Sequence, residues 1–391
     1  MAGRYPWRAA ATNWTIESSR TSNLMRAQPH YIHVTVRRIA QTAPPLVAIL
    51  CAAIFSGAPM RAQEDPTLDA ARRRFPDVNA GFRAIRRGPD GAYYILAPAT
   101  PSDPGDSPKR ASRATLWKRS QPPAHSVPVV LIFDAQGKKL RQIPARPRPG
   151  ELVSPSSMDL DASGRVYIAD QSANMVSIYT ADGAPFAHFR VPEPTQIVAL
   201  PGDRFAVCSG NSERLIAVYD LHGTLVREFG ELADLSDDPE LNHRLNVGHL
   251  ASDKAGNLYF AFRYLPEPTV RKYDPNSGYV LDELTLTTLE LQPMAQSARQ
   301  EIARAGSGKP ASPHEIVSAM GVDPETQEIW LALGNLLMHL DNADNNMSSD
   351  RIYTTDRARM VPDSVLVEKD DLLLGSDPLG IYEFPRSGKK K

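Results

Sequence analysis

Residues 158–170 read MDLDASGRVYIAD, and this stretch sets the pattern from which the fold is predicted. It contains a turn of the form Asp-x-x-Gly at Asp161–Gly164, followed directly by the apolar segment Val166–Ala169. Residues 176–189 repeat this arrangement of apolar segments around an Asp-Gly turn. Short apolar segments joined by such turns are typical of antiparallel strands in tight hairpins. Residues 158–189 therefore predict four short antiparallel strands.

The same arrangement recurs along the chain. Clear copies begin near Ile197, Leu250 and Ser318, and weaker copies begin near Phe82 and Ser364. A spacing of about 40 residues is that of the four-stranded blades of a β-propeller. We therefore expect an all-β fold, a six-bladed β-propeller with four-stranded antiparallel blades. Two stacked β-sandwiches are the alternative, because sandwiches are built from the same kind of hairpins.

Three insertions lengthen the spacing between copies. Residues 97–127 are rich in Pro, Ser and Arg, residues 231–246 are acidic and then polar, and residues 287–311 contain a predicted short helix from Pro293 to Ala305. Insertions of this kind leave a propeller at the rims of its blades and do not disturb the core. They are therefore compatible with a closed ring.

The last copy lacks a convincing fourth strand. We expect the segment from Leu68 to Val78 to supply that strand, because this would close the ring and remove a free strand edge that promotes aggregation. The propeller is thus predicted to span residues 63–386, followed by a basic tail at residues 387–391.

The blade motif Asp161–Asp170 and its counterpart Asp253–Tyr259 resemble those of NHL-repeat and TolB-like six-bladed propeller proteins. The likeness covers most of the chain after residue 62. This broad group includes protein-binding scaffolds, lactone hydrolases and a zinc-dependent amidating lyase. The resemblance therefore implies a fold and leaves binding and catalysis both open. It also implies that a catalytic metal, if the protein has one, lies at the mouth of the central channel.

The N-terminal residues 1–62 have the pattern of a targeting segment. Arg37-Arg38 precede the apolar run Pro45–Phe55, and small residues follow up to Ala58 and Ala62. A basic region, a short apolar core and a small-residue exit are typical of a cleaved secretory signal. A membrane span needs about 20 apolar residues, more than this run provides. We expect cleavage after Ala58 or Ala62 and a periplasmic or secreted protein, by either general or twin-arginine export.

Charge and cysteine content restrict the function classes further. The 44 Lys and Arg nearly balance the 45 Asp and Glu, for a net charge of −1. A general nucleic-acid binder needs a basic face, so we expect no nucleic-acid partner. The two cysteines are Cys51, inside the predicted signal, and Cys208, in an apolar run. We expect the mature chain to lack an internal disulfide and to bury Cys208 as a small apolar residue.

No motif with an established chemistry occurs in the sequence. There is no metal-binding cysteine cluster, no Gly-x-Ser-x-Gly, no phosphate-binding loop and no His-Glu-x-x-His. The polar run Asp341–Asn346 does not fit a calcium loop, because Ala343 occupies a ligand position and no distal Glu follows. This run is interpreted as a turn between strands.

The geometry of a propeller indicates where a site belongs. Each innermost strand begins at the same mouth of the central channel, so the residues at those positions converge. The candidate ligand-binding residues at the mouth are Ser157, Thr195, Gln196, His249, His314, Glu315 and Asp363. Of these, His249, His314 and Asp363 are the candidate metal ligands, since imidazole and carboxylate groups bind zinc. The alternative interpretation is that all of them are polar residues that hydrogen-bond neighbouring strand ends.

These observations favour an exported, monomeric, non-enzymatic propeller without a cofactor. It would bind a protein, peptide or glycan through one face and its inserted loops. The alternative is a metal-dependent hydrolase or lyase that holds zinc or calcium at the channel mouth.

Overall fold

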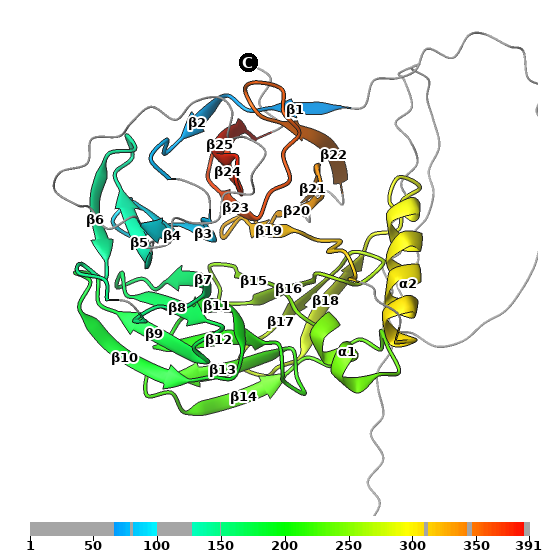
Figure 1. Cartoon of the computed structure of the whole chain (residues 1–391), viewed down its shortest axis with the longest axis horizontal. Helices are drawn as coiled ribbons and strands as arrows, with labels where there is room; N and C mark the ends of the chain where they lie inside the picture. The colour runs from blue at the N-terminus through cyan, green and yellow to red at the C-terminus, as the bar shows by residue number, and fades with distance from the viewer. Residues whose placement is uncertain are drawn as a thin grey trace, which may run out of the picture.

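The computed structural model describes residues 66–78, 81–99, 127–148, 150–308, 312–341 and 346–386. The predicted signal segment, the basic tail and most of the insertion at 97–127 lie outside these residues. Six sheets follow one another around a ring, and five have four strands while one has five (Figure 1). The predicted six-bladed β-propeller is confirmed, and the alternative of two stacked sandwiches is wrong.

The first three blades follow the chain order from the innermost to the outermost strand. Blade 1 consists of β3 (Ala84–Arg87), β4 (Tyr93–Ala99), β5 (Val127–Phe133) and β6 (Lys139–Ile143). Blade 2 consists of β7 (Pro155–Leu160), β8 (Val166–Asp170), β9 (Met175–Tyr179) and β10 (Pro185–Arg190). Blade 3 consists of β11 (Pro194–Leu200), β12 (Arg204–Ser209), β13 (Ile216–Asp220) and β14 (Leu225–Phe229).

The other three blades complete the ring, and two of them take strands from the N-terminal part of the chain. Blade 4 consists of β15 (Gly248–Ser252), β16 (Leu258–Phe262), β17 (Thr269–Tyr273) and β18 (Val280–Thr285). Blade 5 consists of β19 (Ala319–Val322), β20 (Ile329–Leu333), β21 (Leu336–Asp341), β22 (Asn346–Tyr353) and β1 (Thr67–Asp69). Blade 6 consists of β23 (Ser364–Val367), β24 (Asp371–Ser376), β25 (Gly380–Pro385) and β2 (Arg72–Arg74).

The Asp-x-x-Gly turn that recurs in the sequence has a specific structural role. In blade 2 the Asp161 carboxylate accepts hydrogen bonds from the backbone N–H groups of Ser163 at 2.9 Å and Arg165 at 3.0 Å. Gly164 has a φ of 81°, which glycine adopts without the strain that a side chain would cause. The hydroxyl of Tyr167 donates to the same carboxylate at 3.0 Å. The aspartate therefore fixes the turn and positions the buried tyrosine of the next strand.

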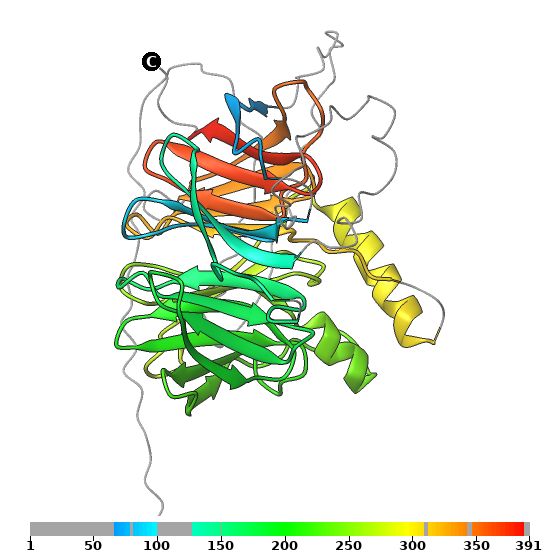
Figure 2. The ribbon, with the colours of Figure 1, turned by 60° about the vertical axis from the view of Figure 1, so that its left-hand side comes forward.

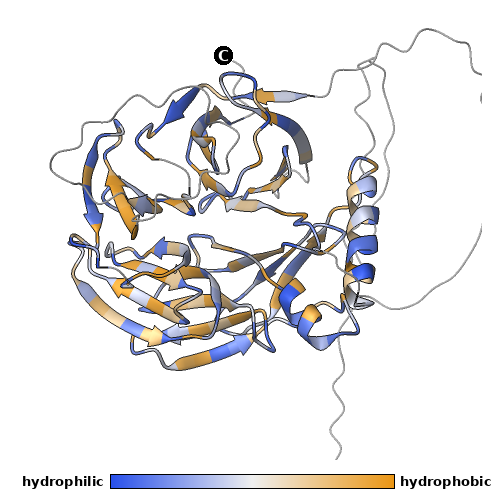
Figure 3. Cartoon of the chain, in the orientation of Figure 1, coloured by the Kyte–Doolittle hydropathy of each residue, from blue (hydrophilic) through white to orange (hydrophobic). Residues whose placement is uncertain are grey.

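The core lies between adjacent blades. Tyr167 of blade 2 packs against Phe205 of blade 3 with ring centroids 5.7 Å apart, and Phe229 of blade 3 packs against Tyr273 of blade 4 at 5.4 Å. Cys208 is buried in the same layer and unpaired, as expected. In Figure 3 the strands carry most of the apolar colour, whereas the two helices show long hydrophilic stretches. Each blade thus buries its apolar faces against its neighbours.

The ring is closed by the N-terminal segment. Strand β2 pairs antiparallel with β25, with Arg72 opposite Glu383, which agrees with the expected closing strand. The Glu383 carboxylate accepts hydrogen bonds from Arg72 at 2.9 and 3.0 Å and from Arg74 at 2.5 Å. Arg74 is buried, so the basic segment Arg72–Arg74 contributes to the structure of the ring. Strand β1, which the sequence did not predict, pairs parallel with β22 of blade 5.

Two of the connections between blades contain helices. Helix α1 (Pro239–Leu245) lies between β14 and β15 and begins after Asp238, whose carboxylate accepts from the N–H groups of Glu240 and Leu241. Helix α2 (Gln292–Gly306) lies between β18 and β19, where the sequence predicts a helix from Pro293 to Ala305. Neither helix in the described part of the chain has the length and apolarity that crossing a membrane requires. Figure 2 shows both helices projecting from the same side of the ring.

The closing ion pairs yield a stability prediction. Substitution Glu383→Gln leaves the buried Arg74 guanidinium without its anionic partner, which we expect to lower the free energy of unfolding by about 3 kcal/mol. Urea denaturation at pH 7 measures the change. The matched control Glu228→Gln, on the exposed strand β14, is expected to stay within about 0.5 kcal/mol of the wild type. An equal effect of both variants would show that the closure does not depend on this carboxylate.

Candidate functional site

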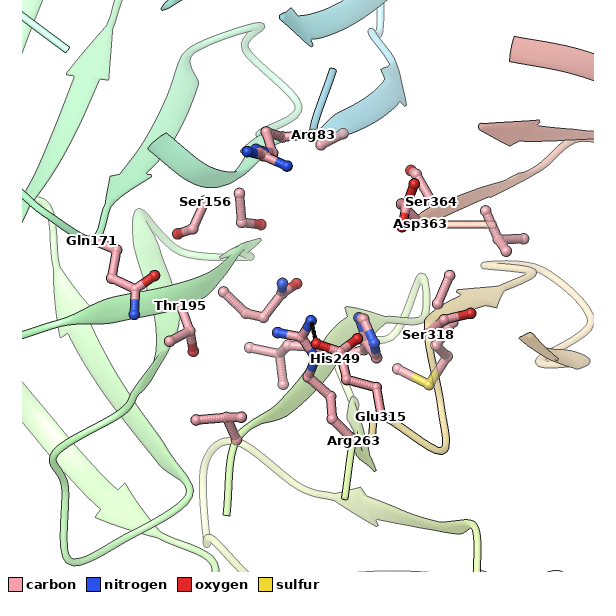
Figure 4. A pocket seen from close by; sticks show the side chains of 18 of the residues that line it. Arg83, Ser156, Gln171, Thr195, His249, Arg263, Glu315, Ser318, Asp363 and Ser364 are labelled. Atoms are coloured by element: carbon pink, nitrogen blue, oxygen red, sulfur yellow. Dashed lines mark hydrogen bonds and ion pairs between the residues drawn. The ribbon is translucent and has the colours of Figure 1, made fainter. Parts of the chain in front are cut away.

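The six innermost strands are β3, β7, β11, β15, β19 and β23, and each contacts the next around the ring. Because every blade starts on its innermost strand, all six strands begin at the same end of the central channel. A cavity of about 750 Å³ lies at this mouth. Its size falls within the range of about 300–1,000 Å³ that is usual for ligand pockets. Figure 4 shows its polar side chains arranged around an open centre.

The structure brings most of the predicted site residues to this cavity. It is lined by the predicted residues Ser157, Thr195, Gln196, His249, Glu315 and Asp363. His314 does not line it. The histidine lies directly before Glu315 but bonds to the insertion helix, with its Nδ1 at 2.8 Å and its backbone N–H at 2.9 Å from the carboxylate of Glu301 in α2. Its side chain is 82% exposed.

Several hydroxyl groups at the mouth hold neighbouring strands together. The Ser156 hydroxyl donates to the carbonyl of Pro194 in blade 3 at 2.9 Å. The Thr195 hydroxyl donates to the carbonyl of Cys208 on the adjacent strand at 3.1 Å. Ser157 accepts from the N–H of Ile197 at 3.4 Å. These groups satisfy strand ends at the channel, which is the role that the alternative interpretation gives them.

His249 is buried at the start of blade 4, and its charge state is set by its surroundings. Burial and the nearby Arg263 guanidinium lower its pKa to about 3, although the carbonyl of Val317 favours the protonated form. The ring is therefore neutral near pH 7. Its Nε2 lies 3.1 Å from the Val317 carbonyl, so this nitrogen carries the proton and donates it to blade 5. The other ring nitrogen, Nδ1, keeps its lone pair.

The three candidate metal ligands each have separate protein partners. His249 bonds to a backbone carbonyl, His314 bonds to Glu301, and Asp363 accepts from the backbone N–H of Asp377 at 2.7 Å. No group of three or more His, Cys, Asp or Glu side chains is placed to hold a metal ion in the part of the chain that the structure describes. Sequence reasoning grouped these residues by strand position and did not anticipate that α2 holds His314 away from the mouth.

The acidic residues of the cavity differ in how they are compensated. Glu315 forms an ion pair with Arg263 and also accepts from the hydroxyl of Tyr264 at 3.4 Å. Asp363 has no ion pair in the described residues, and protein atoms around it displace water, which raises its pKa. The negative charges of Asp377 and Glu315 raise that pKa further, whereas Arg83 lowers it.

Sequence reasoning missed the arginines of the cavity. The four that line it are Arg83, Arg86, Arg244 and Arg263. Arg83 immediately precedes the innermost strand of blade 1, so strand position alone identifies it. Arg263 follows β16, whose end returns to the same mouth. Arg244 comes from α1, and no sequence pattern indicates that it lies at the cavity. Its position depends on how that helix folds back over the ring.

Arg86 has a different role from the other arginines. Its Nε donates to the carboxylate of Asp159 on β7 at 3.3 Å, and the same carboxylate accepts from the N–H of Ala199 on β11 at 2.9 Å. This chain of contacts joins the innermost strands of blades 1, 2 and 3. We therefore assign Arg86 and Asp159 to holding the channel wall.

No protein-family model and no curated protein sequence matches the chain. Solved structures with a similar fold include virginiamycin B lyase from Staphylococcus aureus, which is 12% identical over 80% of this chain and 88% of its own, with a TM-score of 0.46. A streptogramin B lyase is 14% identical over 78% and 93%, with a TM-score of 0.47. The protein U3-55K is 12% identical over 81% and 99%, with a TM-score of 0.49. At this level the similarity concerns overall fold and extends to no function.

The buried His249 predicts a specific pH dependence. Its folded-state pKa of about 3 lies below the ordinary value of 6.5, so below pH 6.5 the unfolded chain takes up a proton that the folded protein does not. This contribution to stability is complete above pH 6.5 and is lost as the pH falls, by about 1.4 kcal/mol per pH unit. We expect His249→Gln to reduce the dependence of unfolding free energy on pH between 7 and 5.

The exposed His222 provides the control for this measurement, because His222→Gln removes a histidine outside the cavity. Urea denaturation of the wild type and both variants at several pH values shows whether the change in pH dependence is specific to His249. Equal pH dependence in the wild type and His249→Gln would contradict the assignment of a neutral His249.

Proposed function

We propose that the chain is a non-enzymatic binding propeller that holds a peptide segment of another protein at the mouth of its central channel. The observation that carries the proposal is the polar cavity of about 750 Å³ where the six innermost strands begin. Ligand sites are concave and largely preformed, and their placed polar groups fix the orientation of the ligand. The rigid ring provides a preformed site, which lowers the entropy cost of binding.

The charges in the cavity favour a peptide over a neutral glycan. Four arginines and four acidic residues, the latter being Glu193, Glu315, Asp363 and Asp377, line the described wall. A peptide offers backbone N–H and carbonyl groups together with charged termini and side chains, all of which such a wall can pair. A neutral sugar offers only hydroxyl groups, which can hydrogen-bond the charged side chains but bring no charge to pair with them.

Both helical insertions reach the site. Arg244 in the last turn of α1 lines the cavity, and Glu315 lies on the connection that follows α2. The helices stand on one side of the ring, as Figure 2 shows. A peptide in the channel mouth would therefore contact both insertions, and the protein that carries the peptide would rest on that face.

The hydrogen bonds of the cavity support a binding role without catalysis. In the described residues that line it, no serine or threonine hydroxyl is bonded to a histidine or a carboxylate, as activation of a nucleophile requires. The hydroxyls of Ser156, Thr195 and Ser318 donate to backbone carbonyls instead. His249 donates its Nε2 proton to Val317 in the same way.

A substitution that fills the cavity tests the proposal. We expect Gln196→Trp to reduce at least tenfold the amount of a random hexapeptide library that the immobilised protein retains, because the indole occupies the space at the channel mouth. Gln136→Trp, in the exposed turn between β5 and β6, is the matched control and should leave retention unchanged. Mass spectrometry of the eluted peptides measures the result. Equal retention by both variants, or no retention by the wild type, would refute the proposal.

We also propose that the chain acts in the periplasm or outside the cell after its N-terminal segment is removed. All six blades are formed by residues 67–385, so cleavage after Ala58 or Ala62 leaves every described strand in place. We expect N-terminal sequencing of protein from the extracytoplasmic fraction to begin at Pro59 or Gln63. Full-length protein that remains in the cytoplasm would contradict export.

A further inference from the structure

Two arginines of the cavity make no direct side-chain bond within the described part of the chain. Neither Arg83 nor Arg244 forms a side-chain hydrogen bond or an ion pair with any residue that the structure describes, and both are exposed within the cavity wall. The other two are paired, Arg86 with Asp159 and Arg263 with Glu315. The ring therefore uses two of its channel arginines for its own structure and leaves two available.

The available arginines approach the cavity from opposite walls. Arg83 precedes the innermost strand of blade 1, and Arg244 precedes the innermost strand of blade 4. Blades 1 and 4 face each other across a ring of six. Figure 4 shows Arg83 opposite Arg263, which is also a residue of blade 4. A group at the centre of the mouth therefore lies between two guanidinium groups, in a cavity that also contains carboxylates.

The carboxylates of the cavity make contacts of their own, and Asp363 is close enough to Arg83 for that positive charge to lower its pKa. Glu315 is already paired with Arg263, and Asp363 and Asp377 accept hydrogen bonds from the backbone N–H groups of Asp377 and Gly81. Glu193 belongs to blade 3, and its carboxylate lies beside Gly210 at the cavity wall. As a carboxylate that lines the cavity, it can accept hydrogen bonds from the N–H groups of a ligand.

The chemistry that fits this arrangement is a carboxylate next to amide N–H groups. A guanidinium group pairs with a carboxylate through two parallel hydrogen bonds, and such charge-assisted bonds are stronger than neutral ones. Arg263 is already engaged by Glu315, so this arginine is less available to a bound carboxylate than the other two. The amide N–H groups of a bound peptide match the Glu193 carboxylate.

We propose that the channel mouth recognises a carboxylate of the bound peptide through Arg83 and Arg244. This inference rests on the proposed function and specifies its ligand. The carboxylate is either the free C-terminus of the peptide or the side chain of an Asp or Glu. Both present the same group to the arginines.

The experiment uses the random hexapeptide library in three forms: with a free C-terminus and no Asp or Glu, with an amidated C-terminus and no Asp or Glu, and with an amidated C-terminus and Asp and Glu included. The wild-type protein is compared with Arg83→Gln, with Arg244→Gln and with the double variant. Arg190→Gln, an exposed arginine on β10 outside the cavity, is the matched control. Thermal melting confirms that each variant is folded.

We expect the wild type and Arg190→Gln to retain at least one carboxylate-bearing form roughly tenfold better than the amidated form that lacks acidic residues. Each single variant should reduce that preference to roughly threefold, and the double variant should abolish it. Preference for the free C-terminus identifies a peptide end, and preference for the acidic library identifies a side chain.

Failure of the carboxylate inference can be distinguished from failure of the proposed peptide binding. If the wild type retains all three forms equally and Gln196→Trp abolishes retention, the mouth binds peptides and the carboxylate inference is wrong. If the double variant keeps the preference, the arginines are not its cause, and the inference is equally wrong. If the wild type retains no form of the library, the proposed function fails together with the inference.

Discussion

Closure of the ring is the constraint on which the other features depend. A blade of four antiparallel strands has two apolar faces, and each face is buried only if another blade stands on that side. Strand β2 meets this requirement by joining blade 6, and the pairing of Arg72 and Arg74 with Glu383 fixes it there. Once the ring is closed, six strand beginnings are brought to one mouth. The cavity is therefore a consequence of the closure.

The polar residues at the mouth divide into two groups by their partners. Ser156, Thr195 and the pair Arg86 with Asp159 bond to backbone groups or to each other across neighbouring strands, and they hold the channel wall. Arg83 and Arg244 have no such bonds among the described residues and face the cavity. A polar residue at a channel mouth is thus informative about ligands only after its protein partners are known.

Sequence patterns predict the features that local chemistry determines. The Asp-x-x-Gly turn at Asp161 and the tyrosine that follows it form one bonded unit, so the repeat and the blade count are readable from the chain. Strand β1 and helix α1 escaped prediction because their stability depends on contacts with distant segments. The same reason explains His314, which a glutamate of the insertion helix holds outside the cavity, and Arg244, which α1 carries into it.

A peptide at the channel mouth is expected to place a carboxylate between Arg83 and Arg244. The most direct test is a crystal structure of the protein with a peptide that it selects from the library. We expect a carboxylate within hydrogen-bond distance of both guanidinium groups, with peptide N–H groups toward Glu193. A peptide bound elsewhere, for example on the exposed apolar residues Val226 and Tyr279 at the outer rim, would contradict it.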